Sequence, residues 1–232
     1  DYISLSNYLK WKKYDNFIDW DIPNWSRALQ YLDKHKHTEF YGKKVLEIGS
    51  GYGSLSFWAA SNGAKVLCSD IVAPSEVAIN IARTYKIKNI KFEKLNVLKM
   101  PYRDEFDFVL FKSVLGGISR SNNLSDIKRI MYGIHDVLKP AGECLFIKNM
   151  NGIILHQYLR KRYGAGKNMW YYLSLKDFSD LSKPFKFVKY RTFGFLGFGD
   201  YYLKGIRSKL DYYFEKIISP TWNYIYSGIY KK

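Results

Sequence analysis

A short apolar run that ends in three alternating glycines constrains the fold of this chain more than any other feature. It reads VLEIGSGYG over residues 45–53, and a helical pattern through Leu55, Trp58 and Ala59 follows. Glycines remove side chains where the backbone must turn sharply and approach a ligand, and the start of the helix offers free N–H groups. The pattern predicts a strand, a turn and a helix that bind a nucleotide-like ligand, although glycines alone also fit an ordinary tight turn.

The spacing of these glycines distinguishes two kinds of nucleotide cofactor. A dinucleotide-binding turn has the pattern G-x-G-x-x-G, whereas here Gly53 is the third glycine and position 54 is serine. Glu47 also places an acid where the pyrophosphate of a dinucleotide would be repelled. A cationic sulfonium cofactor with an amino group meets neither objection, so the segment favours that class of cofactor.

A carboxylate stands at the end of the next predicted strand. Asp70 comes 17 residues after Gly53, and a strand-end carboxylate can accept hydrogen bonds from both hydroxyls of a ribose. A strand-end aspartate that caps a turn is the structural alternative. Together with the glycine segment, Asp70 predicts a nucleoside site.

From residue 43 onward, short apolar runs alternate with helical patterns, which is typical of strand-helix-strand crossovers and a mostly parallel sheet. Strands are predicted at residues 44–48, 64–69, 90–95, 106–111 and 143–148, with further strand-like segments at 185–193 and 222–230. Helices are predicted from Asn24 as N-cap to residues 34–37, through 55–59, from about Pro74 to Tyr85, over 124–138 and over 201–217. A turn at 139–142, which contains Pro140 and Gly142, is expected to end the helix at 124–138.

Length and composition favour one globular domain. The 232 residues are 47% hydrophobic and 25% charged, which suits a single core. We divide them into an N-terminal flap and helix (1–40), a cofactor-binding core (41–149), an insertion that covers the acceptor (150–183) and C-terminal strands and helix (184–232). No run of about 18 uncharged apolar residues is present, so no membrane span is expected. The first residue is Asp1 rather than Met, which leaves a lost leader open.

Cysteine content and net charge bear on the compartment and the partners. Cys68 and Cys144 lie in strand-like runs and predict buried thiols, in keeping with a reducing cytoplasm. The formal net charge of +16 favours an anionic partner such as nucleic acid, a phosphorylated metabolite or an anionic membrane surface, and a solvated lysine-rich surface is the alternative. No HExxH, paired CxxC, P-loop lysine motif or nucleophilic serine elbow is present. No metal is therefore predicted, and a Mg²⁺ site formed by scattered aspartates is the alternative.

The glycine segment and Asp70 together resemble the class I S-adenosylmethionine-dependent methyltransferases, at motif level over residues 40–150 and in element order through 232. The segment FDFVLFKSVLGGI at 106–118 resembles the family's fourth strand and the loop that delivers side chains toward the transferred methyl. The resemblance implies an α/β, Rossmann-like, seven-stranded and mostly parallel sheet with an antiparallel last strand, helices on both faces and an insertion after strand 5. It also implies S-adenosyl-L-methionine as cofactor and S-adenosyl-L-homocysteine as product.

The same resemblance implies roles for individual residues. In this family the three glycines pass along the methionine part of the cofactor, the carboxylate at the position of Asp70 holds the ribose, and the end of the third strand faces the adenine. Asn96 stands where the family often has aspartate, and its amide can still bond the adenine edge without contributing charge. Lys112 either lines the cofactor or is solvated. The cofactor residues carried over are Glu47, Gly49, Gly51, Gly53, Asp70, Ile71, Asn96, Val97 and Lys112.

An acceptor hydroxyl must lose its proton, so a base is expected at the sheet edge where the fifth strand ends. His156 follows that strand and is the predicted catalytic base, with a structural histidine as the alternative. The other histidines, at positions 35, 37 and 135, are expected at the surface. The predicted substrate-binding residues are Asn149, Arg160, Trp170 and Tyr171.

This acceptor segment resembles a subgroup of methyltransferases found with bacterial capsule and O-antigen polysaccharide biosynthesis. Aromatic rings there can stack on a sugar, and the basic run 160–162 can meet a phosphate of a nucleotide-linked or lipid-linked acceptor. An amphipathic cover over the site is the alternative. We therefore expect a cytoplasmic enzyme that O-methylates a sugar or a phosphorylated glycan precursor, with RNA methylation or non-catalytic S-adenosylmethionine binding as alternatives. Nucleic acid is not the expected partner, peripheral membrane contact stays open, and the sequence does not indicate an oligomeric state.

Overall fold

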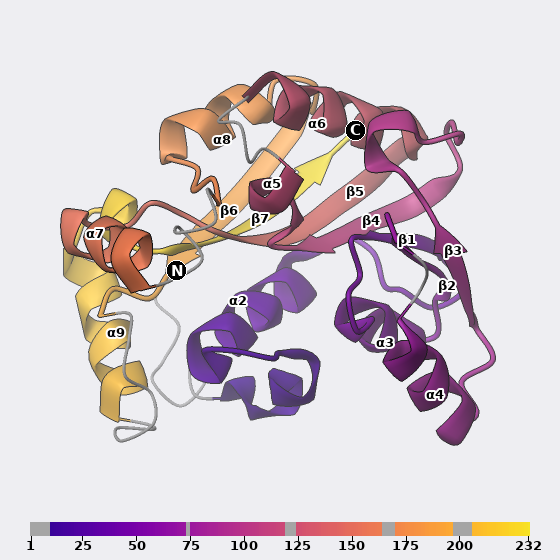
Figure 1. Ribbon diagram of the computed structural model, residues 1–232, viewed down its shortest axis with the longest axis horizontal. Coiled ribbons are helices and arrows are strands. Elements are labelled where there is room, and N and C mark those ends of the chain that lie inside the picture. The colour runs from indigo at the N-terminus through magenta and orange to yellow at the C-terminus, as the bar shows by residue number, and fades with distance from the viewer. Residues whose placement is uncertain (1–9, 73–74, 119–123, 164–169, 197–205) are drawn as a thin grey trace.

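The computed structural model describes residues 10–72, 75–118, 124–163, 170–196 and 206–232. They form a seven-stranded sheet in the order β3-β2-β1-β4-β5-β7-β6 (Figure 1). The strands are β1 (Lys44–Ile48), β2 (Lys65–Asp70), β3 (Ile90–Lys94), β4 (Phe106–Lys112), β5 (Leu138–Asn149), β6 (Phe187–Phe193) and β7 (Ile225–Lys231). The strands β1 to β5 pair in parallel, and β7 runs antiparallel to both of its neighbours. The predicted Rossmann-like α/β sheet with an antiparallel last strand is confirmed.

Helices cover both faces of this sheet (Figure 1). On one face lie α2 (Ile22–His35), α3 (Ser54–Ser61) and α4 (Glu76–Thr84), and on the other lie α5 (Val114–Ile118), α6 (Leu124–Val137) and α8 (Leu175–Leu181). Two more helices, α7 (Ile154–Tyr163) and α9 (Ile206–Ile217), lie at the end of the sheet where β5 finishes and β7 begins. Short 3-10 helices are η1 (Lys10–Phe17), η2 (Val97–Lys99) and η4 (Pro220–Trp222).

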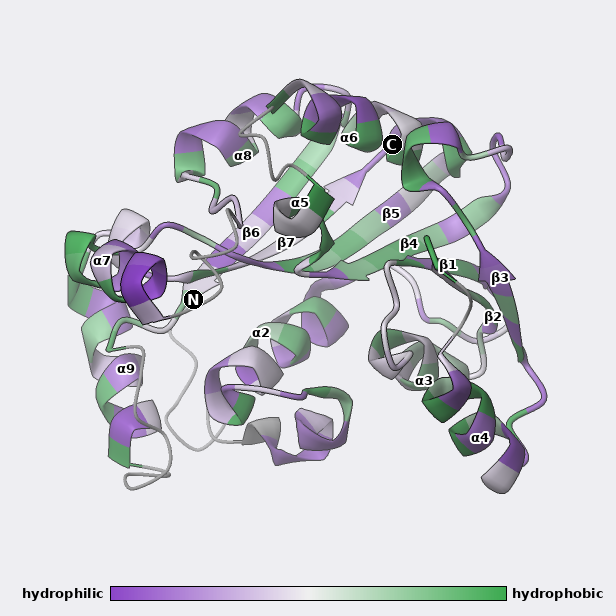
Figure 2. Cartoon of the chain, viewed as in Figure 1, coloured by the Kyte–Doolittle hydropathy of each residue, from purple (hydrophilic) through white to green (hydrophobic). Residues whose placement is uncertain are grey.

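The sheet separates two apolar cores, and successive residues of a strand enter them in turn. In β5, Leu145 and Ile147 pack with α2 and α3, whereas Cys144 and Phe146 pack with α6 and α8. A strand with both faces buried reads as a continuous apolar run, which is the pattern of the central strands in Figure 2. This packing fixes the carboxyl ends of β1, β2, β4 and β5 along one edge, because parallel strands all point the same way.

The start of α2 differs from the prediction of Asn24 as N-cap. The helix begins at Ile22 after Asp21, a residue with φ of 43° and no side-chain cap, and Pro23 occupies the first turn. Asn24 is buried instead, and its amide donates to Asp211 at 2.8 Å and to the hydroxyl of Tyr224 at 2.7 Å. The Asn24 side chain therefore bonds to α9 and to the residue before β7, and it does not cap the helix.

The expected turn at 139–142 is wrong, because these residues already belong to β5. The strand begins at Leu138, and its register against β4 shifts between the pairs Phe106–Leu138 and Phe108–Glu143, which is a bulge. Ala141, not Gly142, has the positive φ, of 64°. A Cβ on Gly142 would lie 2.9 Å from the carbonyl oxygen of Lys139, so this glycine is required for close backbone approach.

The remaining boundaries agree with the predictions to within a few residues. Ser75 occupies the N-cap position of α4 without a side-chain hydrogen bond to the helix, while Pro74, expected in its first turn, lies outside the described residues. The predicted insertion contains α7 and α8, and of the helix predicted at 201–217 the structure describes α9. Cys68 and Cys144 are buried free thiols, as expected. Among the described helices, none combines the length and apolarity needed to cross a bilayer.

Candidate active site

The glycine turn between β1 and α3 carries three residues in the left-handed region. Gly49, Gly51 and Gly53 have φ values of 60°, 53° and 78°, which any residue with a Cβ adopts only at a cost. A Cβ on Gly49 would lie 2.5 Å from Val114 Cγ2, so that glycine is also needed for packing. A Cβ on Gly51 would meet no protein atom within 4 Å. The backbone at Gly51 therefore faces open space that a ligand can enter.

Glu47, the acid before these glycines, points toward the start of α3. Its carboxylate is buried and accepts hydrogen bonds from the backbone N–H of Ser56 at 2.7 Å and from the Ser56 hydroxyl. Burial raises the pKa of Glu47 to about 7, and the hydrogen bonds from Ser56 oppose that rise. Glu47 thus ties α3 to β1 and holds the turn in shape, while direct contact with the cofactor stays a prediction.

Asp70 lies beside the glycine turn, because β2 pairs in parallel with β1 and both end at the same edge. One carboxylate oxygen accepts from the N–H of Gly51 at 3.0 Å, and the other accepts from the N–H of Ile71 at 2.7 Å. Ile71 itself is 59% exposed. The carboxylate predicted to hold a ribose is therefore positioned next to the open face of Gly51.

The residues predicted to contact the adenine come directly after β3, the next strand along this edge of the sheet. The N–H of Leu95 donates to the carbonyl of Asp70 at 2.8 Å, which brings the end of β3 beside the end of β2. Asn96 caps η2 by accepting from the N–H of Leu98 at 3.0 Å, and this leaves its amide N–H₂ available to a ligand. Val97 is buried beneath it. The structure thus brings the predicted adenine residues next to the predicted ribose residue.

Lys112, at the end of β4, reaches across to the start of α3 and to the N-terminal segment. Its ammonium donates to the Ser54 hydroxyl at 2.8 Å and to Asp19 at 2.7 Å, and it lies 4.7 Å from the ring centroid of Trp20. Asp19 and Trp20 were not among the predicted site residues. Nothing in the local pattern marks them, because they reach the glycine turn only through the packing of η1 against α3 and α2.

These residues fit S-adenosyl-L-methionine as the sequence predicts. The glycine turn offers an unobstructed backbone at Gly51, and Asp70 presents an oriented carboxylate beside it. Asn96 supplies a free amide donor one strand further along. These groups lie after the carboxyl ends of the neighbouring strands β1, β2 and β3, where open α/β sheets bind ligands.

On the predicted acceptor side, residues from three segments meet at the ends of β4 and β5. The amide of Asn149 lies 3.5 Å from the hydroxyl of Ser113, which is buried and has φ of 60°. Tyr171 donates its N–H to the carbonyl of Gly116 at 3.1 Å, and a Cβ on Gly116 would lie 2.2 Å from Trp170 Nε1. Trp170 and Tyr171 therefore cover α5, directly after the loop that follows β4.

His156 lies in a different environment from the one expected of an open catalytic base. It is 2% exposed, its ring contacts Tyr224 edge-on at 5.3 Å, and its Nδ1 would lie 2.7 Å from a Cβ on Gly152. Burial, reinforced by the charge of Arg160, lowers the pKa of His156. The imidazole is therefore neutral and has a nitrogen that can accept a proton, but the lowered pKa also makes it a weaker base, and none of these neighbours belongs to the glycine turn. Its catalytic role stays a proposal.

The basic run 160–162 divides into one inward and two outward side chains. Arg160 donates to the carbonyl of Met150, and its guanidinium lies 4.5 Å from the ring centroid of Tyr172. Lys161 and Arg162 are exposed. Next to Arg160 the structure reveals Lys148, a fully buried lysine near the end of β5 that was not predicted. A lysine within an apolar strand run, CLFIK, is the signal that would have pointed to it.

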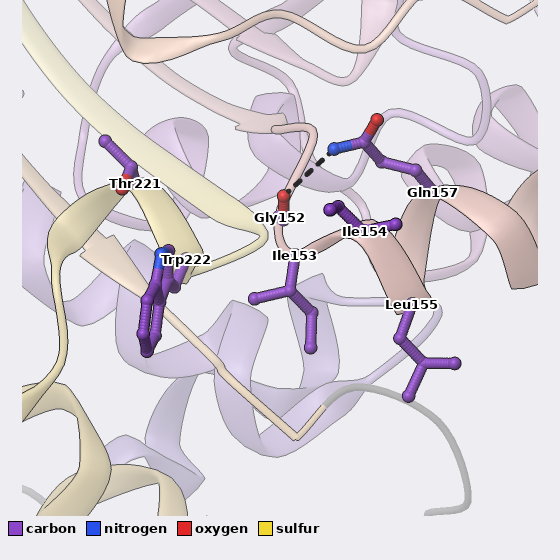
Figure 3. A pocket seen from close by; sticks show the side chains of 7 residues that line it. All are labelled: Gly152, Ile153, Ile154, Leu155, Gln157, Thr221 and Trp222. Atoms are coloured by element: carbon purple, nitrogen blue, oxygen red, sulfur yellow. Dashed lines mark hydrogen bonds between the residues drawn. The ribbon is translucent and has the colours of Figure 1, made fainter.

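A shallow apolar depression lies apart from the glycine turn, between the start of α7 and η4 (Figure 3). Ile153, Leu155 and Trp222 are among its lining side chains, and Gln157 donates to the carbonyl of Gly152 at 3.3 Å at its rim. It contains none of the predicted cofactor residues. In the described part of the chain, no group of three His, Cys, Asp or Glu side chains is arranged to hold a metal ion.

Comparison with known proteins agrees with this geometry. A family model described as "Methyltransferase domain" matches residues 39–171. The strand order and the glycine turn are those of class I methyltransferases, the enzymes that use S-adenosyl-L-methionine as methyl donor. The chain belongs to this methyltransferase domain family.

Curated relatives match over about half of the chain. The ribosomal protein L11 methyltransferases of Prochlorococcus marinus strains MIT 9215 and MIT 9301 are 35% identical over 123 residues and 32% identical over 129 residues. Each match spans 52% of this chain, and it covers only 38% and 39% of the relatives' own length. The activity of those longer proteins is therefore not transferred to this chain.

Solved structures share the fold at low sequence identity. The YcgJ protein of Bacillus subtilis has a TM-score of 0.67 at 15% identity, covering 88% of this chain and 97% of that one. Phosphoethanolamine N-methyltransferase 2 of Haemonchus contortus, solved with phosphomonomethylethanolamine and S-adenosylhomocysteine, has a TM-score of 0.65 at 17% identity, covering 99% of this chain and 60% of that one. These similarities show a common fold.

Proposed function

We propose that this chain transfers the methyl group of S-adenosyl-L-methionine to a hydroxyl oxygen of a sugar or phosphorylated glycan precursor, in the synthesis of a bacterial surface polysaccharide. The observation that carries the proposal is the acceptor side, where the rings of Trp170 and Tyr171 and the cation of Arg160 gather at the ends of β4 and β5. Aromatic faces stack on sugar rings, and a guanidinium pairs with phosphate.

Methyl transfer from a sulfonium is an in-line displacement, so the enzyme mainly has to position the two reactants. When bound, the cofactor supplies an electrophilic methyl group on a cationic sulfur. The glycine turn, Asp70 and Asn96 are the parts of this chain that would hold it. The Lys112–Asp19 ion pair holds the N-terminal segment against the same edge of the sheet.

For an oxygen acceptor, a base must also take up the hydroxyl proton as the new C–O bond forms. We propose His156 for this step, since it follows β5 in the chain and its imidazole is neutral, although burial and the charge of Arg160 weaken it as a base. The amide of Asn149, close to Ser113 at the end of β4, would orient the acceptor hydroxyl.

The test is a turnover assay with defined acceptors. The purified chain would be incubated with S-adenosyl-L-methionine and a panel of sugar phosphates and nucleotide-linked sugars, with S-adenosyl-L-homocysteine and the methylated product measured by mass spectrometry. We expect that S-adenosyl-L-homocysteine is released only when a sugar acceptor is present, and that the methylated product carries the methyl group on oxygen. Release with RNA or a ribosomal protein, and none with any sugar, would overturn the proposal.

The net charge of +16 favours a second candidate function, RNA methylation. Binding to RNA through phosphate contacts weakens steeply as salt rises. RNA capture that is independent of salt, or undetectable at low salt, would remove this candidate. A chain that binds the cofactor and never turns over any acceptor would instead be a non-catalytic binding protein.

A further inference from the structure

Lys148 is enclosed completely at the carboxyl end of β5. Its ammonium donates to the carbonyl oxygens of Asn149 at 3.1 Å and Tyr171 at 3.5 Å. The ring centroids of Trp170 and Tyr172 lie 5.7 and 5.5 Å from it. The lysine therefore faces the acceptor-side segment from beneath, and each of its neighbours stabilises a positive charge only in part.

Arg160 brings a second cation to the same place. Its guanidinium lies 4.5 Å from the centroid of Tyr172, the ring that also contacts Lys148, and its hydrogen bonds go to the carbonyls of Met150 and Asn151. Burial, together with the nearby charge of Arg160, lowers the pKa of Lys148 to about 7, and burial also lowers the pKa of Arg160. Two basic side chains therefore lie close together, Lys148 fully buried and Arg160 half-buried.

The other enclosed cations of the described residues each have a carboxylate partner. Arg27 pairs with Glu215 at 3.1 Å, Lys112 pairs with Asp19 at 2.7 Å, and Lys36 pairs with Asp33 at 2.9 Å. Neither Lys148 nor Arg160 forms an ion pair with a carboxylate anywhere in the described ranges. Burying a charge without a counter-ion is unfavourable, and proteins keep such an arrangement where a ligand completes it.

The carboxylate of Asp21 favours the charge of Arg160. That carboxylate is engaged by the guanidinium of Arg207 and by the hydroxyl of Tyr224. Asp21 therefore compensates the Lys148–Arg160 pair only in part. The pair lies next to Asn149, so the remaining negative charge would come from the predicted acceptor side of the site.

We propose that Lys148 and Arg160 form an oxyanion site that binds a phosphate or carboxylate group of the methyl acceptor. The inference rests on the proposed function for the role of this anion, and it narrows the acceptor to a molecule with an anionic group beside the methylated atom. Arg160 supplies a planar pair of donors to the oxyanion, and Lys148 supplies charge from below. The rings of Trp170 and Tyr172 flank the apolar part of the same molecule.

Inorganic phosphate is the probe that tests the site, with acetate as the carboxylate probe. Thermal unfolding of the whole chain would be followed at neutral pH and constant ionic strength, with chloride as the reference anion. We expect phosphate or acetate to raise the unfolding temperature of the wild type, and the stronger of the two identifies the acceptor's anion. Lys148→Met and Arg160→Gln should weaken the apparent affinity by about tenfold or more. Lys161→Gln, on the exposed face of the same helix, should leave it unchanged.

The variants also report on folding. Lys148→Met should unfold at an equal or higher temperature than the wild type in chloride, because it removes a buried charge that lacks a counter-ion. Arg160→Lys keeps the charge but loses the planar donor pair. It replaces Arg160→Gln in the anion-binding test if that variant fails to fold. An anion effect that is absent in the wild type, or equal in the wild type and both site variants, would overturn the oxyanion site.

The same samples separate this inference from the proposed function. S-adenosyl-L-homocysteine binding, measured by calorimetry, should be unaffected in Lys148→Met because that residue is not in the glycine turn. If the anion effect is found but sugars are not methylated, only the proposed acceptor fails. If uncharged sugars are methylated and no anion binds, only the oxyanion site fails.

Discussion

The carboxylate of Asp70 at the end of β2 accepts a hydrogen bond of 3.0 Å from the backbone N–H of Gly51 in the turn after β1. The same carboxylate accepts from the N–H of Ile71 at 2.7 Å, so both of its oxygens are oriented by backbone donors. Each carboxylate oxygen has a second lone pair, which leaves acceptor capacity for the hydroxyls of a ribose. Asp70 therefore helps to fix the glycine turn, and its oriented carboxylate is available for the ribose that we predict it binds.

We expect Asp70→Ala to weaken the binding of S-adenosyl-L-homocysteine by roughly 1.5–3 kcal/mol, the usual value for hydrogen bonds to a charged group. Isothermal calorimetry measures this directly. Asp70→Asn, which keeps an oxygen for the N–H of Gly51, should lose less, and Asp136→Ala on the exposed end of α6 should lose nothing. Unchanged affinity in Asp70→Ala would remove the ribose assignment.

Gly51 and Gly42 form a matched pair for a test of the cofactor turn. Both have positive φ, 53° and 72°, and neither has a protein atom within 4 Å of a built Cβ. Alanine at either position should cost about 1 kcal/mol of folding stability from backbone strain. Only Gly51→Ala should also weaken cofactor binding, because its methyl group enters the space that the ligand uses. Equal cofactor affinities for the two variants would argue against a ligand at Gly51.

If His156 is the base, His156→Gln should lower turnover by about 100-fold or more while cofactor affinity is kept. Because the side chain is buried against Tyr224, the variant's unfolding temperature must be measured alongside. His135→Gln, in a partly exposed position on α6, is the control and should turn over normally. Wild-type turnover in a folded His156→Gln variant would assign this histidine a structural role.

The protonation of Glu47 should make stability depend on pH in the acidic range. Its pKa is raised from 4.5 to about 7 in the folded chain, so the folded state binds more protons than the unfolded state between those values. The contribution of Glu47 is therefore fully present below about pH 4.5 and is lost as the pH rises through about 7. Glu47→Gln should flatten this fall in urea unfolding series, and an identical pH dependence in both proteins would contradict the assignment.

Features that depend on residues close in the sequence were predicted, whereas features that depend on distant segments were not. The glycine turn and Asp70 were predicted because their conformations depend on neighbours in the chain and on two strands that pair in parallel. The antiparallel last strand was predicted from the resemblance to a family with the same order of elements, and not from local sequence patterns. The bulge at 139–142 escaped prediction because the partner strand, not the local proline and glycine, decides the register.

Sequence alone thus determined the glycine turn and the strand-end carboxylate beside it, which we expect to bind a nucleoside. Tertiary structure alone decided the acceptor side. It turned Arg160 inward and Lys161 outward, enclosed Lys148, and brought Asp19 onto Lys112. The physical reason is that backbone conformation is encoded locally, whereas the burial and pairing of a charge depend on which distant segments pack against it.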